Sequence, residues 1–204
     1  DDFRSPFQRD IDRIIFSSSF RRLQDKTQVF PLARNDYIRT RLTHSMEVSS
    51  VGRSLGLLVG RELTKRYKLP VDSNSIAEIV GAACLAHDIG NPPFGHAGED
   101  TIRHWFLDPR RGKKYLDTLQ EEEAEEFINF EGNAQGFRVL TRLQRHTRDN
   151  NTMGGLQLTY ATLGAFLKYP RPAKITGTSE SRRSQKKYNY FRTEKDQFQK
   201  ELTK

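Results

Sequence analysis

The chain has 204 residues, with 34 Lys and Arg against 26 Asp and Glu and a formal net charge of +8 at pH 7. A chain of this length is close to the size of one domain and can bury a substantial core. Its apolar runs are far shorter than the roughly 20 residues that cross a bilayer, and its first residues carry no apolar signal segment. We therefore expect a cytoplasmic protein with no membrane partner. The single cysteine, Cys84, fits a reducing compartment.

The positive charge is concentrated at the C-terminal end. Residues 171–204 hold ten basic residues against four acidic ones. Basic residues alternate there with Tyr188, Tyr190 and Phe191, a pattern typical of segments that follow a nucleic-acid backbone and stack on its bases. A charged connector to a further C-terminal part is the interpretation that we prefer, and phosphate binding at a subunit boundary is a third. We expect two parts, a core at 1–170 and a basic polar segment at 171–204.

Hydrophobic spacing predicts helices in the first third of the chain. A helix is expected at 10–23, followed by a short extended piece at 27–32 that contains Pro31. Within 40–66, one histidine and several apolar residues advance by four, three, four and three, which places them on one helix face. These residues are His44, Val48, Val51, Leu55 and Leu58. We expect this whole face to pack inward.

The next helix is expected to open at a capping box, because Ser75 is followed three residues later by Glu78. Its inward stripe ends at His87. Gly90 and the two prolines that follow prevent the helix from continuing.

The rest of the core is also predicted to be helical. Further helices are expected at 96–106, 130–146 and 156–167, and the acidic run at 121–126 is expected to be a solvated helical face or a mobile connector. On the first of these, His96 and Glu99 face the same way because they are three residues apart. We find no internal repeat and no strand-rich region, so the predicted fold class is mainly α.

The stretch 86–99 carries the side chains with the clearest chemistry. The doublet His87 and Asp88 follows an apolar run, and His96 and Glu99 come after a Gly/Pro turn. Neutral imidazole and carboxylate are groups that hard or borderline divalent cations accept as ligands. A single His on an apolar helix face is more often a hydrogen-bonded core residue, so the prediction depends on the combination.

We predict that His44, His87 and Asp88 hold a divalent metal ion, because burying these polar groups is costly unless a cation satisfies them. Three protein ligands leave positions open for water and a substrate oxygen, which is typical of catalytic sites. The sequence has no Cys cluster that could close a structural zinc site.

The sequence resembles the HD-domain phosphohydrolases, whose signature is His…His-Asp…Asp on a helical bundle. Longer motifs narrow the resemblance to the deoxyguanosine triphosphate triphosphohydrolase (dGTPase) family and cover nearly the whole chain. They lie at 20–24, 26–32, 39–45, 86–99, 130–135 and 158–163. The resemblance implies hydrolysis of dGTP or other dNTPs to a deoxynucleoside plus tripolyphosphate, with Mn2+ or Mg2+ as cofactor. It also implies a homo-oligomer, a hexamer in this family, and single-stranded DNA or a nucleotide effector as a further partner.

The resemblance also assigns roles to individual residues. His44, His87 and Asp88 match metal ligands, and His96 and Glu99 match a catalytic pair beside the α-phosphate. An imidazole held by a carboxylate can move a proton or protonate the leaving 5′-oxygen.

Three further residues match substrate-binding positions. Arg41 matches a phosphate-binding arginine, and its planar guanidinium suits a polyphosphate, although a solvated charge at a helix start is the alternative. Gln28 matches a residue that reads the sugar 3′-hydroxyl, with a plain loop hydrogen bond as the alternative. Asn133, together with Gln135, supports the pocket or caps a helix. Asn91 stands where some relatives carry another His.

One part of the family signature is missing from the chain. The family's last ligand is an Asp on a later helix, and after Asp149 the sequence has only Asp196, in a polar context unlike that helix. We expect the core at 1–170 to be incomplete, with the remaining ligand beyond residue 204. The rival functions are an HD-type phosphomonoesterase or phosphodiesterase and a non-catalytic module that binds nucleotides or single-stranded DNA.

Overall fold

The computed structural model of the protein describes residues 3–28, 39–144, 154–173 and 187–202, without the side chains at 197 and 200–202. These residues form helices, turns and two isolated bridges, with no strand among them. The prediction of a mainly α fold is confirmed. None of the described helices combines the length and the apolar character needed to cross a membrane.

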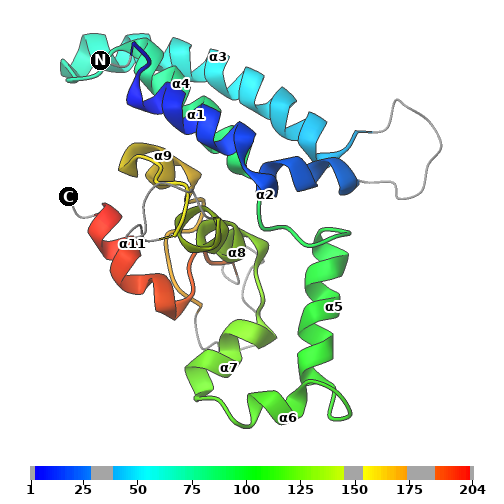
Figure 1. Cartoon of the computed structure of the whole chain (residues 1–204). Helices are drawn as coiled ribbons and strands as arrows, with labels where there is room; N and C mark the ends of the chain where they lie inside the picture. The colour runs from blue at the N-terminus through cyan, green and yellow to red at the C-terminus, as the bar shows by residue number, and fades with distance from the viewer. Residues whose placement is uncertain (1–2, 29–38, 145–153, 174–186, 203–204) are drawn as a thin grey trace.

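Two long helices run antiparallel across one end of the molecule (Figure 1). They are α3 (Arg41–Tyr67) and α4 (Ser73–Ala86). Beside them lie α1 (Pro6–Phe16), α2 (Ser18–Arg21) and the 3-10 turn η1 (Arg22–Asp25), and α9 (Tyr160–Phe166) also packs against α4.

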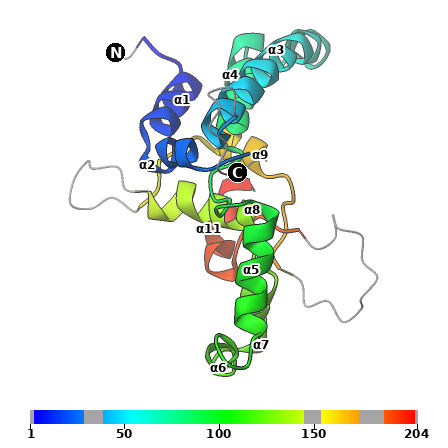
Figure 2. The ribbon, with the colours of Figure 1, turned by 90° about the vertical axis from the view of Figure 1, so that its right-hand side faces the viewer.

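The remaining helices extend away from this layer, as Figure 2 shows from the side. The outward path follows α5 (His96–Leu107), α6 (Lys113–Leu116) and α7 (Glu121–Ile128). The chain returns through α8 (Gly132–Arg138) and its π-helical continuation η2 (Val139–Leu143). Near the C-terminus lie η3 (Arg192–Glu194) and α11 (Lys195–Leu202).

The hydrophobic core fixes the backbone at the predicted site. Ile14, Phe137 and Leu140 are among its most completely buried side chains, and they come from α1, α8 and η2. Ile89 belongs to the same cluster and is 2% exposed. Because Ile89 directly follows Asp88, burial of its side chain holds the end of α4 in place.

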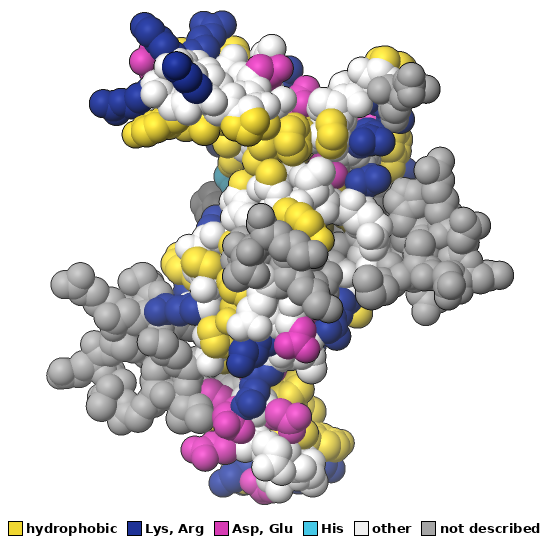
Figure 3. Space-filling model, turned by 90° about the vertical axis from the view of Figure 1, so that its left-hand side faces the viewer, with side chains coloured by type: hydrophobic (Ala, Val, Ile, Leu, Met, Phe, Trp, Pro, Cys, Tyr) yellow, Lys and Arg dark blue, Asp and Glu magenta, His cyan; other side chains and the backbone are white. Residues whose placement is uncertain are grey.

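The face of α3 that packs against α4 is built from small residues. Gly52, Gly56 and Gly60 are buried, and a Cβ at Gly52 would lie 2.5 Å from Cys84 Sγ. The expectation that the apolar stripe of this helix packs inward is wrong, because Val51, Leu55 and Leu58 are each more than half exposed. Figure 3 shows hydrophobic side chains at the surface of these upper helices, next to basic ones.

The helix predicted at 10–23 is broken at Ser17. Its hydroxyl donates to the Ile14 carbonyl oxygen at 2.7 Å and accepts from the Phe20 N–H at 3.2 Å. One side chain thus ends α1 and caps α2, which explains the break in an otherwise helical pattern.

The expected capping box at Ser75 is also wrong. α4 begins at Ser73, and its N-cap is Asp72, three residues before Ser75; the Asp72 carboxylate accepts from the Ser75 N–H at 2.7 Å. Glu78 instead accepts a hydrogen bond from the Ser5 hydroxyl at 2.5 Å. By contrast, α3 starts directly after its N-cap Thr40, close to the predicted position.

Other predicted bounds shift in the structure. α5 begins at His96 and α7 covers the acidic run, as expected. The helix expected at 130–146 begins at Gly132, and its last residues lie outside the described part. The helix expected at 156–167 is shorter, because Thr159 caps it and accepts from the Thr162 N–H at 3.3 Å. Most of the extended piece at 27–32 lies outside the described residues.

The aromatic residues near the C-terminus pack into the body of the protein. Tyr188, Tyr190 and Phe191 are at most 6% exposed, and the Tyr190 ring stacks on Phe198 with centroids 4.1 Å apart. The three rings therefore do not form an exposed row on which the bases of a nucleic-acid strand could stack. Residues 174–186 lie outside the described part, and the division of the chain at residue 170 stays a prediction.

Candidate metal centre and active site

The structure brings the three predicted metal ligands together. His44 comes from α3, and His87 and Asp88 come from the C-terminal end of α4. One ligand atom from each lies within 4.8 Å of the other two. The two imidazole rings meet edge to face, with centroids 5.2 Å apart. Two nitrogen donors and one carboxylate on adjacent helices form a donor set that suits a divalent cation.

The hydrogen bonding of His87 prepares it to act as a ligand. Its Nδ1 lies 2.6 Å from the Cys84 carbonyl oxygen, which can only accept, so Nδ1 carries the proton and Nε2 keeps its lone pair. Burial lowers the pKa of His87, although Asp88 acts in the opposite direction, and this favours the neutral imidazole. An orienting bond on the second ring nitrogen is typical of metal-ligating histidines.

Asp88 is fixed through both of its carboxylate oxygens. Arg41 Nη1 donates to Oδ2 at 2.9 Å, and Asn91 Nδ2 donates to Oδ1 at 2.6 Å. Arg41 and Asp88 are 7% and 5% exposed, so the alternative of a solvated charge at the helix start is wrong for Arg41. Lys26 Nζ donates to the Asn91 carbonyl oxygen at 2.7 Å, and burial followed by the charge of Arg41 lowers the Lys26 pKa.

His96 and Glu99 form a hydrogen-bonded pair at the start of α5. The imidazole is exposed, the carboxylate is buried, and His96 Nδ1 donates to Glu99 Oε2 at 2.8 Å. The other oxygen, Oε1, accepts from the Gly132 N–H at 2.8 Å. The pair therefore presents an imidazole Nε2 to solvent while the supporting carboxylate is held by the backbone of α8.

Gly132 connects this pair to the predicted metal ligands. A Cβ at this position would lie 2.5 Å from Asn91 Oδ1 and 2.8 Å from Glu99 Oε1. Asn91 orients the predicted ligand Asp88, and Glu99 orients His96. Gly132 therefore lies between the two orienting side chains. Any side chain here would displace at least one of them.

The predicted substrate-binding residues occupy different environments. Gln28 Oε1 and Arg41 Nε are buried and have no hydrogen-bond partner among the described residues. Two unsatisfied polar atoms of this kind fit a site that is completed by a bound group. Asn133 Nδ2 instead donates to Glu131 Oε1 at 2.5 Å. Glu131 is the N-cap of α8, so Asn133 contacts the capping residue of this helix.

Sequence reasoning missed several residues that hold the site. Asn91 was noted only as a departure from relatives, and Lys26 and Gly132 only as parts of motifs. Arg103 is a further example, because its Nε and Nη2 donate to the Phe130 carbonyl oxygen at 2.9 and 2.6 Å and fix the loop before α8. The glycine within the motif at 130–135 is the one signal that could have indicated a close approach.

The fold and this cluster define a class of protein: a helical bundle in which His, His and Asp from two adjacent helices converge on one metal position. The sequence pattern of the HD domain matches residues 41–176, and the chain belongs to the HD domain family. The His-His-Asp cluster lies within the part of the chain that the family pattern covers.

Several proteins that carry a functional name are similar to this chain over most of its length. A Pseudomonas aeruginosa protein named deoxyguanosinetriphosphate triphosphohydrolase-like is 58% identical over 167 residues, which cover 82% of this chain and 37% of that protein. A Synechocystis protein of the same name is 51% identical over 203 residues, which cover 96% of this chain and 44% of that protein. An Enterobacter deoxyguanosinetriphosphate triphosphohydrolase is 40% identical over 230 aligned positions, which cover 97% of this chain and 44% of that protein. The chain thus spans less than half the length of these curated relatives.

Proposed function

We propose that this chain is the metal-binding part of a dNTP triphosphohydrolase, which converts dGTP or other dNTPs to a deoxynucleoside and inorganic tripolyphosphate. The observation that carries the proposal is that Asp88, one of the three clustered residues predicted to bind metal, is connected to the His96–Glu99 pair through Asn91 and Gly132. The names of the relatives, deoxyguanosinetriphosphate triphosphohydrolases and proteins like them, supply the substrate class.

His44, His87 and Asp88 would hold the cation, Mn2+ or Mg2+, which when bound supplies a Lewis acid for the phosphoryl oxygens. In the proposed reaction, a water oxygen forms a bond to the α-phosphorus while the bond from that phosphorus to the 5′-oxygen breaks. In its imidazolium form, His96 donates Nδ1–H to Glu99 and gives its solvent-facing Nε2 proton to the departing 5′-oxygen, while the proton released by the attacking water passes to bulk solvent.

Two residues are proposed to bind the substrate directly. Arg41 uses one guanidinium nitrogen on Asp88, and its Nε–H, which has no partner among the described residues, donates to a phosphate oxygen. Gln28 Oε1 is likewise unpartnered within the described part and accepts from the sugar 3′-hydroxyl. Asn133 is proposed to support the pocket through Glu131.

The test is to identify the phosphate product of the full-length protein with Mn2+ or Mg2+ and each dNTP. Ion chromatography distinguishes tripolyphosphate, which supports the proposal, from orthophosphate, which would indicate a phosphomonoesterase. His87→Ala is expected to abolish turnover, and the exposed His104→Ala on α5 serves as the matched control. Undiminished hydrolysis by a folded, metal-stripped His87→Ala protein would contradict the proposal.

We also propose that the full-length protein is a cytoplasmic homo-oligomer, a hexamer, that responds to single-stranded DNA or a nucleotide effector. The exposed Val51, Leu55 and Leu58 of α3 support association, because contiguous apolar side chains favour a covered surface. Light scattering tests the assembly. Binding to single-stranded DNA through the basic residues of 171–204 should weaken steeply with salt, and salt-independent or undetectable binding would remove that part of the proposal.

A further inference from the structure

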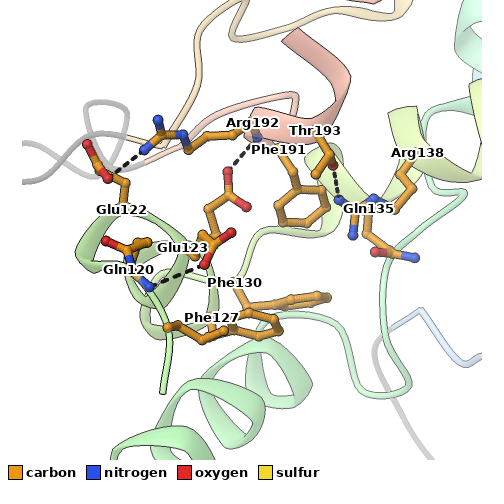
Figure 4. Close-up of a pocket in the computed structure, with 12 residues that line it drawn as sticks. Gln120, Glu122, Glu123, Phe127, Phe130, Gln135, Arg138, Phe191, Arg192 and Thr193 are labelled. Atoms are coloured by element: carbon orange, nitrogen blue, oxygen red, sulfur yellow. Dashed lines mark hydrogen bonds and ion pairs between the residues drawn. The ribbon is translucent and has the colours of Figure 1, made fainter. Parts of the chain in front are cut away.

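A cavity apart from the predicted metal ligands lies between α7, α8 and the segment at 191–193 (Figure 4). Its volume is about 480 Å³, within the range of sites that bind small molecules. None of the proposed metal ligands, nor His96 or Glu99, lines it. Gln135 is the one lining residue for which the sequence predicts a role beside the substrate, so the cavity is built mainly from residues that the proposed hydrolysis does not use.

Aromatic rings form its apolar walls. Figure 4 shows the Phe127 and Phe130 rings along one side, with Phe191 across the space from them. The guanidinium carbon of Arg138 lies 4.2 Å from the centroid of the Phe191 ring, which holds that ring in place. Walls of this kind favour a flat aromatic ligand, because offset stacking needs planar surfaces on both partners.

Two polar groups in the cavity are left for a ligand. The Gln135 side-chain amide makes no hydrogen bond within the described part of the chain, so it offers both a donor and an acceptor. Glu126 Oε1 accepts from the Arg192 N–H at 2.6 Å, and its Oε2 has no partner among the described residues. Burial raises the pKa of Glu126. These groups match the mixed donors and acceptors on the edge of a nucleobase.

The charges around the cavity disfavour a phosphate. Arg138 pairs with Glu194 at 3.0 Å, and Arg192 pairs with Glu122 at 2.9 Å, so both cations are already engaged. Glu123 and Glu126 form no ion pair among the described residues, which leaves the lining with an excess of negative charge. A polyphosphate would meet like charges here, whereas an uncharged ligand would not.

We propose that this cavity binds an uncharged nucleoside whose base carries an amino group. The base stacks among Phe127, Phe130 and Phe191, and its edge bonds to the Gln135 amide and the Glu126 carboxyl group. The proposal goes beyond the proposed hydrolysis and does not depend on it. A deoxynucleoside is also the organic product of that reaction, so the site offers a place where product is retained or sensed.

The experiment is calorimetric titration of deoxyguanosine into the full-length His87→Ala protein with a chelator present, which keeps the predicted metal site out of the measurement. Saturable binding is expected, and dGMP and dGTP should bind at least about tenfold more weakly. Adding Gln135→Leu or Phe127→Ala should weaken deoxyguanosine binding about tenfold. Phe127 is 39% exposed, so its replacement leaves the core of the protein intact.

Tyr160→Ala is the matched control, because this aromatic residue is exposed on α9 and does not line the cavity. It should leave the affinity unchanged, and thermal unfolding should show that each variant is folded. Absence of saturable deoxyguanosine binding, tighter dGTP binding that Phe127→Ala weakens, or equal deoxyguanosine affinity in a folded Phe127→Ala protein would each overturn the proposal. Loss of hydrolysis in the separate product assay has no bearing on this outcome.

Discussion

His96 Nδ1 lies 2.8 Å from Glu99 Oε2, and this bond joins an imidazole that is 81% exposed to a carboxylate that is 3% exposed. The buried carboxylate fixes which ring nitrogen carries the proton and therefore which one faces solvent. Glu99 is itself held by the Gly132 N–H, so the orientation of His96 depends on α8 as well as on its own helix.

Glu99→Gln should lower kcat by about 10²–10⁴-fold, because a neutral amide no longer stabilises the imidazolium that forms and disappears during proton transfer. The measurement is the rate of tripolyphosphate release at saturating dNTP. Asp100→Asn is the control, since this neighbouring carboxylate is 60% exposed and pairs only with Arg103 in the described part of the chain. An unchanged kcat in Glu99→Gln would remove the pair from the proposed mechanism.

Asn91→Ala should weaken Mn2+ binding about 10–100-fold without removing a predicted ligand. The reason is that Asn91 Nδ2 holds Asp88 Oδ1, and losing this bond frees the carboxylate to rotate. Calorimetric titration of the metal-free protein with Mn2+ gives the affinity. The exposed His104→Ala should match the wild type, and equal affinities for all three proteins would show that Asn91 has no orienting role.

Local signals allowed much of the fold and the site to be predicted from the sequence. Thr40 and the Gly/Pro turn before His96 mark helix starts through their own backbone chemistry, and the structure places α3 and α5 there. The sequence also predicted that His44, His87 and Asp88 converge. His44 and His87 each stand at one end of a row of apolar residues on a predicted helix face, and the motifs around them are long.

What the sequence could not reveal depends on contacts between distant segments. The packed face of α3 carries Gly52 and Gly56, which give no hydrophobic signal, while the apolar Leu55 points away from α4. The network through Gly132 joins residues from three segments, and nothing in their spacing indicates it. The burial of Tyr188 in a basic, polar segment likewise follows from tertiary packing.

Gly132→Ala should destabilise the protein by about 1–3 kcal/mol and reduce kcat, because its Cβ would press against Asn91 Oδ1 and Glu99 Oε1. Gly81→Ala in α4 is the matched control. There a Cβ meets only Arg53 and Ser49 at 3.4 Å or more, and alanine favours the helix by about 0.5–1 kcal/mol. Urea unfolding and steady-state assays compare the two. Similar effects of both substitutions would contradict the network.

Gly52→Ala should destabilise the chain by about 1–3 kcal/mol, because a Cβ would approach Cys84 Sγ in the α3–α4 contact. Leu55→Gln on the same helix should change stability by no more than about 0.5 kcal/mol in this chain, since Leu55 is 55% exposed. Chemical unfolding of the 204-residue chain measures both. A larger loss in Leu55→Gln than in Gly52→Ala would mean that the apolar stripe packs inward after all.

Tyr188→Phe should reduce the fall in stability that the wild type shows at alkaline pH. Burial, followed by the charges of Glu126 and Glu131, raises the pKa of Tyr188 above its usual value of 10.0. Above that pH the unfolded chain releases the phenol proton while the folded chain keeps it, so the free energy of unfolding decreases by about 1.4 kcal/mol per pH unit.

Near neutral pH the same variant should be less stable than the wild type by about 1 kcal/mol, because the Tyr188 hydroxyl donates to the Glu126 carbonyl oxygen. The difference between the two proteins should then shrink as the pH rises above 10, which denaturant titrations at a series of pH values would detect. Tyr115→Phe provides the control, since Tyr115 is 52% exposed and should leave the pH profile unchanged. A constant difference between wild type and Tyr188→Phe from pH 8 to beyond 10 would mean that the folded protein does not protect this phenol, because only unequal proton binding in the two states produces a slope.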